Sequence, residues 1–299
     1  MGVVVIGQIG RDVVMRVDEL PAAGGTASGG ERREMMGGKG ANQAVGLAQL
    51  WVPTALIGVV GEDIQGAALL RQATRDGIDV FCVARRGPTA LLLDVVDGGA
   101  TRLLVEDVPD TSLVTIDDLD RCSALFRTAD VVSIQSQQPA ATVLAAARHA
   151  SRLGARVMVD GAPDTDDLDG LLASVDVLRA DATEAELIGG TAVRTVDDAT
   201  KVGEQLLGRG PDLVALAVPD VGDLLVWDGD SELFPHADVS VIDRTGAGDA
   251  FMAGLVTALR RGDDPRRAGE LASSAAASTV RRLGGRPDLS GLLGRQEGL

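Results

Sequence analysis

Short apolar runs alternate along the chain with longer segments of helical spacing. The runs are rich in Val, Leu and Ile and lack polar alternation, which is typical of strands covered by helices on both faces. They lie at 3–6, 55–60, 131–134, 157–159, 175–178 and 213–218. The segments with helical spacing are 66–76, 139–153, 197–209 and 250–261. This order predicts an α/β fold with a mostly parallel central sheet between helices, and the polar tail after Gly284 predicts a loop with a short last helix.

Two stretches depart from this rhythm. They comprise residues 13–17 with 24–36, and residues 89–105. The second stretch carries Asp97-Gly98-Gly99 between two β-rich runs, 90–96 and 101–105. An Asp-Gly pair between such runs is a strong hairpin signal. The sequence therefore predicts a small β-sheet outside the main sheet.

The charge of the chain limits its partners. Lys and Arg number 28 against 44 Asp and Glu, a net charge of −16, which argues against nucleic acid or an anionic membrane as the main partner. The sequence has no apolar run of about 18 residues and no charged leader with a small-residue cleavage site. These features predict a cytoplasmic protein that acts on a small molecule.

The rare residue types set further limits. Aromatic residues make up 2% of the chain, with no Tyr, so the core must be built from Ala, Val, Leu and Ile. Cys82 and Cys122 lie in apolar contexts and are expected to be separate buried thiols, because a chain of this size rarely needs a disulfide framework. His149 and His236 are far apart, so their spacing predicts no metal site.

A Gly-rich turn precedes the helical segment 250–261. Residues 243–249 read Asp-Arg-Thr-Gly-Ala-Gly-Asp. Gly246 and Gly248 allow close approach of a ligand, and the unpaired N–H groups of a helix start suit a phosphate. A carboxylate would repel that phosphate, so Asp249 fits a base that accepts a proton from an attacking hydroxyl. The alternative is an ordinary strand-to-helix turn, where the helix dipole alone favours an acid.

A second glycine cluster lies far upstream, at residues 37–43, with the sequence Gly-Gly-Lys-Gly-Ala-Asn-Gln. Apolar residues at helical spacing follow it. The cluster lacks the pattern of a P-loop and the order of a dinucleotide-binding fingerprint. Taken alone, the cluster could equally be an ordinary loop that leads into a helix, without a binding role.

Together the two clusters resemble the two signature regions of the ribokinase family of carbohydrate kinases, also called the PfkB family. The resemblance covers nearly the whole chain, because Gly7, Asp12, residues 61–63 and residues 181–184 also match family positions. It implies one domain over residues 1–299 with a ribokinase-like three-layer α/β/α sandwich and a mostly parallel central sheet. A small β-sheet lid would be formed by about 11–36 and 88–106, and the family often dimerises through this lid, which implies a homodimer.

The resemblance also implies an activity, transfer of the ATP γ-phosphoryl group to a hydroxyl of a small sugar or sugar derivative. Asp249 would be the general base, with the backbone N–H groups of Gly246, Ala247 and Gly248 as an anion hole. The residues that match sugar contacts of the family are Asp12, Gly38, Lys39, Asn42, Gln137 and Asp249. Asn42 has an ordinary alternative as a helix cap, and Lys39 as a surface lysine.

The nucleotide side carries a further implied set of residues. The positions that match it are Asp181, Glu184, Asp220, Gly222 and Gly248. Mg²⁺ would enter with ATP and be ordered through water by Glu184, whose ordinary alternative is a helix-start glutamate. A monovalent cation such as K⁺ is implied near Asp243 and Thr245.

The chain departs from the family pattern at several positions. Gly10 stands where ribokinases usually have Asn, and Gln137 where they have a Glu that contacts the sugar. These changes alter which hydroxyls can be paired and argue against ribose itself as the substrate. On the nucleotide side, Asp181 replaces Asn, and Pro219 removes a backbone donor from the nucleotide loop.

Two other functions remain open at this point. A nucleoside kinase of the same fold would favour aromatic stacking on the base, and the lid segments contain no Phe, Trp or Tyr. A sugar- or nucleotide-binding regulator without turnover would explain Gly10, Gln137 and Pro219. Asp249 with the complete Gly-Ala-Gly turn argues against that regulator.

Overall fold

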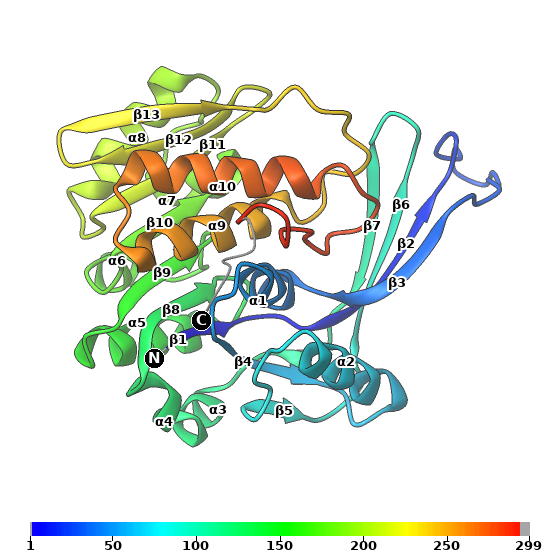
Figure 1. Cartoon of the computed structure of the whole chain (residues 1–299), viewed down its shortest axis with the longest axis horizontal. Coiled ribbons are helices and arrows are strands. Elements are labelled where there is room, and N and C mark those ends of the chain that lie inside the picture. Colours follow the sequence, from blue (N-terminus) through cyan, green and yellow to red (C-terminus); the bar gives the residue numbers. More distant parts are fainter. Residues whose placement is uncertain (1, 294–299) are drawn as a thin grey trace.

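The computed structural model describes residues 2–293, and its largest element is a nine-stranded sheet (Figure 1). Seven strands run parallel: β1 (Gly2–Ile6), β4 (Thr54–Val60), β5 (Val83–Arg85), β8 (Ala129–Gln135), β9 (Arg156–Asp160), β10 (Val177–Ala180) and β11 (Leu213–Val218). An antiparallel hairpin, β12 (Gly222–Trp227) and β13 (Asp230–Pro235), extends one edge. The strand order is β13-β12-β11-β10-β9-β8-β1-β4-β5. The mostly parallel sheet predicted from the apolar runs is confirmed.

Helices cover both faces of this sheet. One face is covered by α1 (Lys39–Gln49), α2 (Ile64–Arg75), α9 (Ala247–Arg261) and α10 (Pro265–Thr279). The other is covered by α3 (Ile116–Arg121), α4 (Ser123–Phe126), α5 (Ala140–Arg152), α6 (Leu168–Leu172), α7 (Ala182–Gly189) and α8 (Val196–Leu207). Successive strand residues point to opposite layers: Val3 and Val5 pack in the first, Val4 and Ile6 in the second. The three-layer α/β/α arrangement is therefore as predicted.

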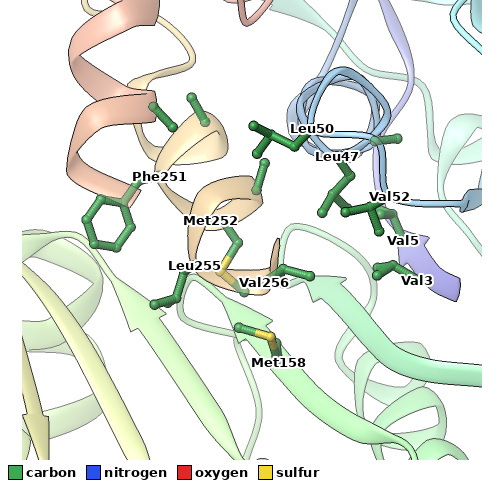
Figure 2. Packing of buried hydrophobic residues seen from close by; sticks show 14 of the residues in the cluster. Val3, Val5, Leu47, Leu50, Val52, Met158, Phe251, Met252, Leu255 and Val256 are labelled. Atoms are coloured by element: carbon green, nitrogen blue, oxygen red, sulfur yellow. The ribbon is translucent and has the colours of Figure 1, made fainter. Parts of the chain in front are cut away.

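The packing of α1 against α9 positions the site. Figure 2 shows the buried side chains that join these helices to β1 and β9: Val3, Val5, Leu47, Leu50, Met158, Met252, Leu255 and Val256. Full burial of a side chain of this kind stabilises the fold by about 1.5–3 kcal/mol. Because α1 and α9 each follow a glycine cluster, this core fixes the two clusters, about 200 positions apart in sequence, beside each other.

Several elements were missed from the apolar pattern, among them one hairpin and one long helix. The β12–β13 hairpin has an Asp228-Gly229 turn, a hairpin signal that the sequence contained. Helix α10 is rich in Ala and Ser, so its apolar stripe is weak, but Asp264 caps it and Pro265 occupies its first turn. The turn residues of the hairpin and the capping residues of α10 would have revealed these elements better than the hydrophobic pattern did.

A separate four-stranded sheet stands at one side of the molecule (Figure 1). Its order is β3-β2-β6-β7, from β2 (Gly10–Arg16), β3 (Arg32–Gly37), β6 (Ala90–Val96) and β7 (Arg102–Asp107). The predicted hairpin between β6 and β7 is confirmed, and Asp97 Oδ1 accepts hydrogen bonds from the backbone N–H groups of Gly99 and Thr101. In the first predicted stretch, the part at 24–36 is strand only from Arg32 onward, because 24–31 has no regular strand.

The expectation of two separate thiols is wrong. Cys82 and Cys122 form a disulfide, with Cα atoms 5.9 Å apart, because the loop before β5 and the end of α3 meet. A second link lies nearby, where the Arg86 guanidinium donates to both carboxylate oxygens of Asp118 at 3.0 and 2.7 Å. Despite burial, this pairing lowers the pKa of Asp118 to about 2.

The predicted last helix is not found in residues 285–293, which form turns and extended backbone, and the rest of the tail lies outside the described residues. Across residues 2–293, none of the helices combines the length and apolarity needed to cross a membrane.

Candidate active site

The turn at residues 243–249 is tied to the loop that follows α10. Asp243 is fully buried, and its Oδ1 accepts hydrogen bonds from Thr245 N at 2.9 Å and Thr245 Oγ1 at 2.7 Å. Its Oδ2 accepts from Gly284 N at 2.8 Å. Gly246 precedes α9 with a φ of 76°, and a Cβ there would collide with the carbonyl of Gly285. The turn is therefore held rigid, with the first N–H groups of α9 beside it.

Asp249 lies in the first turn of α9 and is 6% exposed. Its Oδ2 accepts a hydrogen bond from Asn42 Nδ2 at 2.9 Å. Burial and then the charge of Asp160 raise the pKa of Asp249 to about 7. A carboxylate whose pKa is near neutral is well matched to take a proton from a hydroxyl.

The upstream cluster supplies two inward-pointing amides from α1. Gly38 caps this helix with a φ of 88°, and a Cβ at Gly40 would collide with the backbone of Gly7 in the turn after β1. This close approach buries both Asn42 and Gln43. While Asn42 binds Asp249, Gln43 Nε2 donates to Asp160 Oδ2 at 2.8 Å, at the end of β9.

A lysine and a helix cap lie next to these amides. Lys39 Nζ is 3.1 Å from Glu184 Oε1. Asp181 and Glu184 form a reciprocal capping box at the start of α7, with hydrogen bonds of 2.8 and 2.9 Å. Burial opposes the charge of Lys39, but the carboxylates of Asp160, Glu184 and Asp249 raise its pKa above the ordinary value. Lys39 is therefore a fixed cation close to Asp249.

The small sheet turns an unpaired acid toward this region. Asp12 on β2 is 3% exposed, and its Oδ1 has no hydrogen-bond partner among residues 2–293. Burial and then the charge of Asp94 raise the pKa of Asp12 to about 8. Asp94 itself is ion-paired with Arg102 across β6 and β7.

A cavity of about 250 Å³ lies on the other side of the turn. Its polar lining residues are Arg179, Asp223, His236, Arg244 and Ser273, and Gly248 with Phe251 of α9 also line it. Apolar residues such as Val241 and Val280 form much of the remaining wall. An apolar cavity with polar groups beside a helix N-terminus is suited to a nucleotide, whose base is apolar and whose phosphates are anionic.

Comparison with known proteins places this geometry in a family. Residues 2–290 match the family model described as pfkB family carbohydrate kinase. The chain belongs to this family. It is 34% identical over 285 residues to an ATP-dependent ribose-1-phosphate kinase from Halopiger xanaduensis, covering 94% of this chain and 92% of that protein. It is 28% identical over 283 residues to a ribokinase from Haemophilus influenzae, covering 94% and 92%.

Solved structures of two other kinases share the fold. The structure of Arabidopsis thaliana ribokinase complexed with ribose and ATP superposes with a TM-score of 0.79 at 25% identity, covering 95% of this chain and 93% of that one. An adenosine kinase from Sinorhizobium meliloti has a TM-score of 0.78 at 20% identity, with 97% and 96% covered, and shows the fold alone. The chain is thus an ATP-dependent carbohydrate kinase, as its glycine clusters predicted.

The structure brings most of the predicted site residues of this pfkB kinase together. Asp12, Lys39, Asn42 and Asp249 converge between the small sheet and the start of α9, with Gly38 beside them at the start of α1. Gln137 is exposed, whereas Gln135 at the end of β8 is fully buried with an unpaired Nε2. A sugar-facing role for Gln137 stays a prediction.

The predicted nucleotide loop lies slightly apart from the cavity. Asp220 has a φ of 59° and an exposed side chain 3.7 Å from Arg244, which itself lines the cavity. Gly222 begins β12 and is packed against the backbone of Phe234. Neither is among the described residues that line the cavity, so their contact with a nucleotide stays a prediction.

Several residues of the site were not found from the sequence. They are Gln43, Asp160, Arg179 and Asp223. Gln43 was inside the recognised cluster, and its neighbour Asn42 was the signal. Asp160 and Arg179 each follow an apolar run at the carboxyl end of a parallel strand, which is where ligands of open α/β sheets bind.

Proposed function

We propose that this enzyme transfers the γ-phosphoryl group of ATP to a hydroxyl of ribose or a closely related sugar, with Asp249 as the general base. The observation that carries the proposal is the place of Asp249, buried at the start of α9 between the acid of the small sheet and the cavity lined by Gly248. Its raised pKa keeps it able to accept a proton at neutral pH.

The proposed phosphoryl transfer is an in-line displacement at the γ-phosphorus of ATP. The sugar oxygen forms a bond to the γ-phosphorus while its proton passes to Asp249, and the bond from that phosphorus to the bridging oxygen breaks, leaving the electron pair on ADP. The N–H groups of Gly246, Ala247 and Gly248 face the phosphoryl oxygens, where their dipoles stabilise developing charge. Asn42 keeps Asp249 oriented by its 2.9 Å hydrogen bond.

Sugar binding falls to the small sheet and the start of α1. Asp12 has an unpaired oxygen, so a sugar hydroxyl would supply its missing partner. Gly38, Lys39 and Asn42 would offer the sugar a backbone N–H, an ammonium and an amide, and the exposed Gln137 would offer a second amide. The small sheet then acts as a lid that excludes water during transfer.

The acidic residues near the start of α7 are suited to a Mg²⁺ ion that enters with ATP. Among residues 2–293, no group of three or more His, Cys, Asp and Glu side chains is arranged to hold a metal ion. Glu184 is already engaged by Lys39 and by Asp181 N, which suits a contact to Mg²⁺ through water rather than direct ligation. Mg²⁺ would neutralise phosphate charge. We assign the nearby Asp181, Asp220 and Gly222 to the nucleotide side.

A monovalent cation is proposed at the loop that Asp243 and Thr245 tie to Gly284. An ion there would act on the orientation of the N–H groups of the turn. Comparing rates in KCl with those in choline chloride checks this role, and equal rates in the two salts would rule it out.

The small sheet is also proposed to join two copies of the chain. Its outer face exposes Leu93, Leu103 and Val105, of which Val105 is 57% exposed. Apolar side chains on an exposed sheet favour pairing with a second sheet. Light scattering checks this, since a monomer mass at micromolar concentration would contradict it.

The activity is tested with a substrate panel. Wild type and Asp249→Asn are assayed for ATP consumption with pentoses, hexoses, ketoses, ribose 1-phosphate and nucleosides. We expect turnover with ribose or a related sugar, and a loss of at least about 10²-fold in kcat for the variant, because the base is removed. A rate that survives the substitution contradicts the role of Asp249. Turnover of nucleosides alone supports the nucleoside kinase, and no turnover supports the regulator.

A second candidate substrate is ribose 1-phosphate, which the name of the 34% identical relative suggests. The cation available to a substrate phosphate is Arg102, which is partly exposed and near both Asp12 and Asp94. The two acids weaken its field, so the free sugar is favoured. The ratio of kcat/KM for ribose 1-phosphate to that for ribose decides between them, and Arg102→Gln should lower only the former.

A further inference from the structure

One cation is buried between the catalytic turn and the cavity. Arg179, on β10, is 8% exposed. Among the residues that the structure describes, Asp160 is its sole hydrogen-bond acceptor, with Nη1 3.0 Å from Oδ1. Its buried Nε has no partner. A guanidinium carries five N–H donors, so most of its donor capacity is unused.

The guanidinium lies flat against the turn that holds the transferred phosphoryl group. A Cβ on Gly248 would be 2.7 Å from Nη2 and 2.8 Å from Nη1 of Arg179. The same side chain lines the cavity together with Gly248. Arg179 therefore stands where the cavity meets the N–H groups of α9.

Carboxylates crowd this position. Burial opposes the charge of Arg179, but Asp160, Asp223 and Glu184 raise its pKa above the ordinary value, so it is always a cation. Asp223 is also largely buried and faces the cavity. A polyphosphate entering here would meet several negative charges, and it needs a fixed positive charge to be held.

We propose that Arg179 contacts the terminal phosphates of the nucleotide and supplies the side-chain cation that complements the backbone donors of residues 246–248. Asp160, itself fixed by Gln43, holds the guanidinium in place through one edge and leaves the other donors for phosphate. This inference rests on the proposed use of the cavity for ATP. It adds a second cationic contact beside Lys39, which is paired with Glu184.

The test compares two ligands that differ only in phosphates. Calorimetry measures the binding of a non-hydrolysable ATP analogue with Mg²⁺, and of adenosine, to wild type and Arg179→Gln without sugar. We expect the Kd of the analogue to rise about 10- to 100-fold and that of adenosine to change less than about 3-fold, because only the analogue offers charged acceptors. Arg179→Lys should fall between, since an ammonium keeps the charge but not the fork.

Two control variants separate contact from structure. Arg148→Gln removes an equal charge from an exposed pair with Asp167 and should change neither Kd. The double variant Arg179→Gln with Asp160→Asn removes both buried charges, so it avoids the unpaired carboxylate that could unfold the single variant. It should still bind the analogue as weakly as the single variant does.

The outcomes are distinct from those of the substrate panel. An equal loss of both ligands, or analogue binding restored in the double variant, shows a structural role for Arg179 and overturns the inference. An unchanged Kd for the analogue does the same. If no sugar is phosphorylated but the two ligands still respond differently to Arg179→Gln, the proposed reaction fails and the phosphate contact stands.

Discussion

The two walls of the active site treat buried carboxylates in opposite ways. In the wall built from α1, β9 and α9, Asp249 accepts a hydrogen bond from Asn42, and Asp160 accepts from Gln43 and Arg179. In the wall built from the small sheet, Asp12 is equally buried, but its Oδ1 has no partner in residues 2–293. The buried carboxylates of the first wall have partners within the protein, whereas Oδ1 of Asp12 has none among the described residues.

This difference matches the two roles that we propose, a general base in the first wall and a sugar-binding acid in the second. A base has to be oriented before the substrate arrives, so its partners belong to the protein. A binding group gains most when the ligand supplies the missing hydrogen bond, because an unpaired buried acid is costly until then. Burial of the unpaired Asp12 therefore lowers the stability of the fold on the side that we propose to bind the sugar.

Among the variants that test this difference between the two walls, Asp12→Asn should have the largest effect on activity. At pH 9, above the pKa of Asp12, the amide keeps the shape of the side chain but cannot accept with both atoms, so kcat/KM for the sugar should fall by about 10- to 100-fold. The loss should be carried mainly by KM, which initial-rate measurements at saturating ATP determine. Asp107→Asn, an exposed acid at the end of β7, is the matched control and should keep the wild-type value. An unchanged KM in Asp12→Asn would remove Asp12 from the sugar site.

The pH dependence of the reaction sharpens the role of the other wall. Asp249 must be ionised to accept a proton, so kcat/KM should fall as the pH drops below its pKa of about 7. Asp160 is the main charge that raises this pKa, after burial. Asp160→Asn should therefore move the acid limb of the profile to lower pH.

The control for this profile is Asp169→Asn, an acid whose side chain is 82% exposed in an ion pair with Arg209. It should leave the acid limb in place. If the acid limb of the kcat/KM profile is unchanged in Asp160→Asn, or moves to higher pH, then a group other than Asp249 determines its apparent pKa.

The smallest effect expected is on stability, and it has the opposite sign to the loss of activity. The folded-state pKa of Asp12 is about 8 against an ordinary 3.8, so between these values the folded protein holds a proton that the unfolded chain has lost. The free energy of unfolding therefore falls as pH rises through this window. Asp12→Asn removes that penalty and should raise Tm by about 2–4 °C at pH 9.

At pH 3.5, where Asp12 is largely protonated in both states, the variant and wild type should melt together. Calorimetric scans at the two pH values check this. A Tm lowered at pH 9 would mean that Asp12 is stabilised by a partner in the folded state.

The parts of the fold that were predictable are those with a local cause. Strand β11 was predicted with the bounds that the structure has, because a short run of Val, Leu and Ala is typical of a strand buried on both faces. The turn at 243–249 and the cluster at 37–43 were found because glycine is needed where backbones approach closely, as at Gly246. The hairpin at Asp97 was likewise set by its own residues.

The remainder depended on topology. Asp160 and Arg179 meet because β9 and β10 are neighbours, and nothing within either strand shows that the other is adjacent. Cys82 and Cys122 pair for the same reason, across 40 residues of sequence. Long-range placement of this kind is invisible to periodicity and to short motifs.

Two links anchor the chain segment that carries one hairpin of the small sheet. The Cys82–Cys122 bond and the Arg86–Asp118 pair both close a chain segment that contains β6 and β7. Even if the thiols were reduced, the paired charges would keep the foot of this hairpin in place. If the small sheet closes over the sugar as proposed, its β6–β7 hairpin moves with both ends of its chain segment anchored.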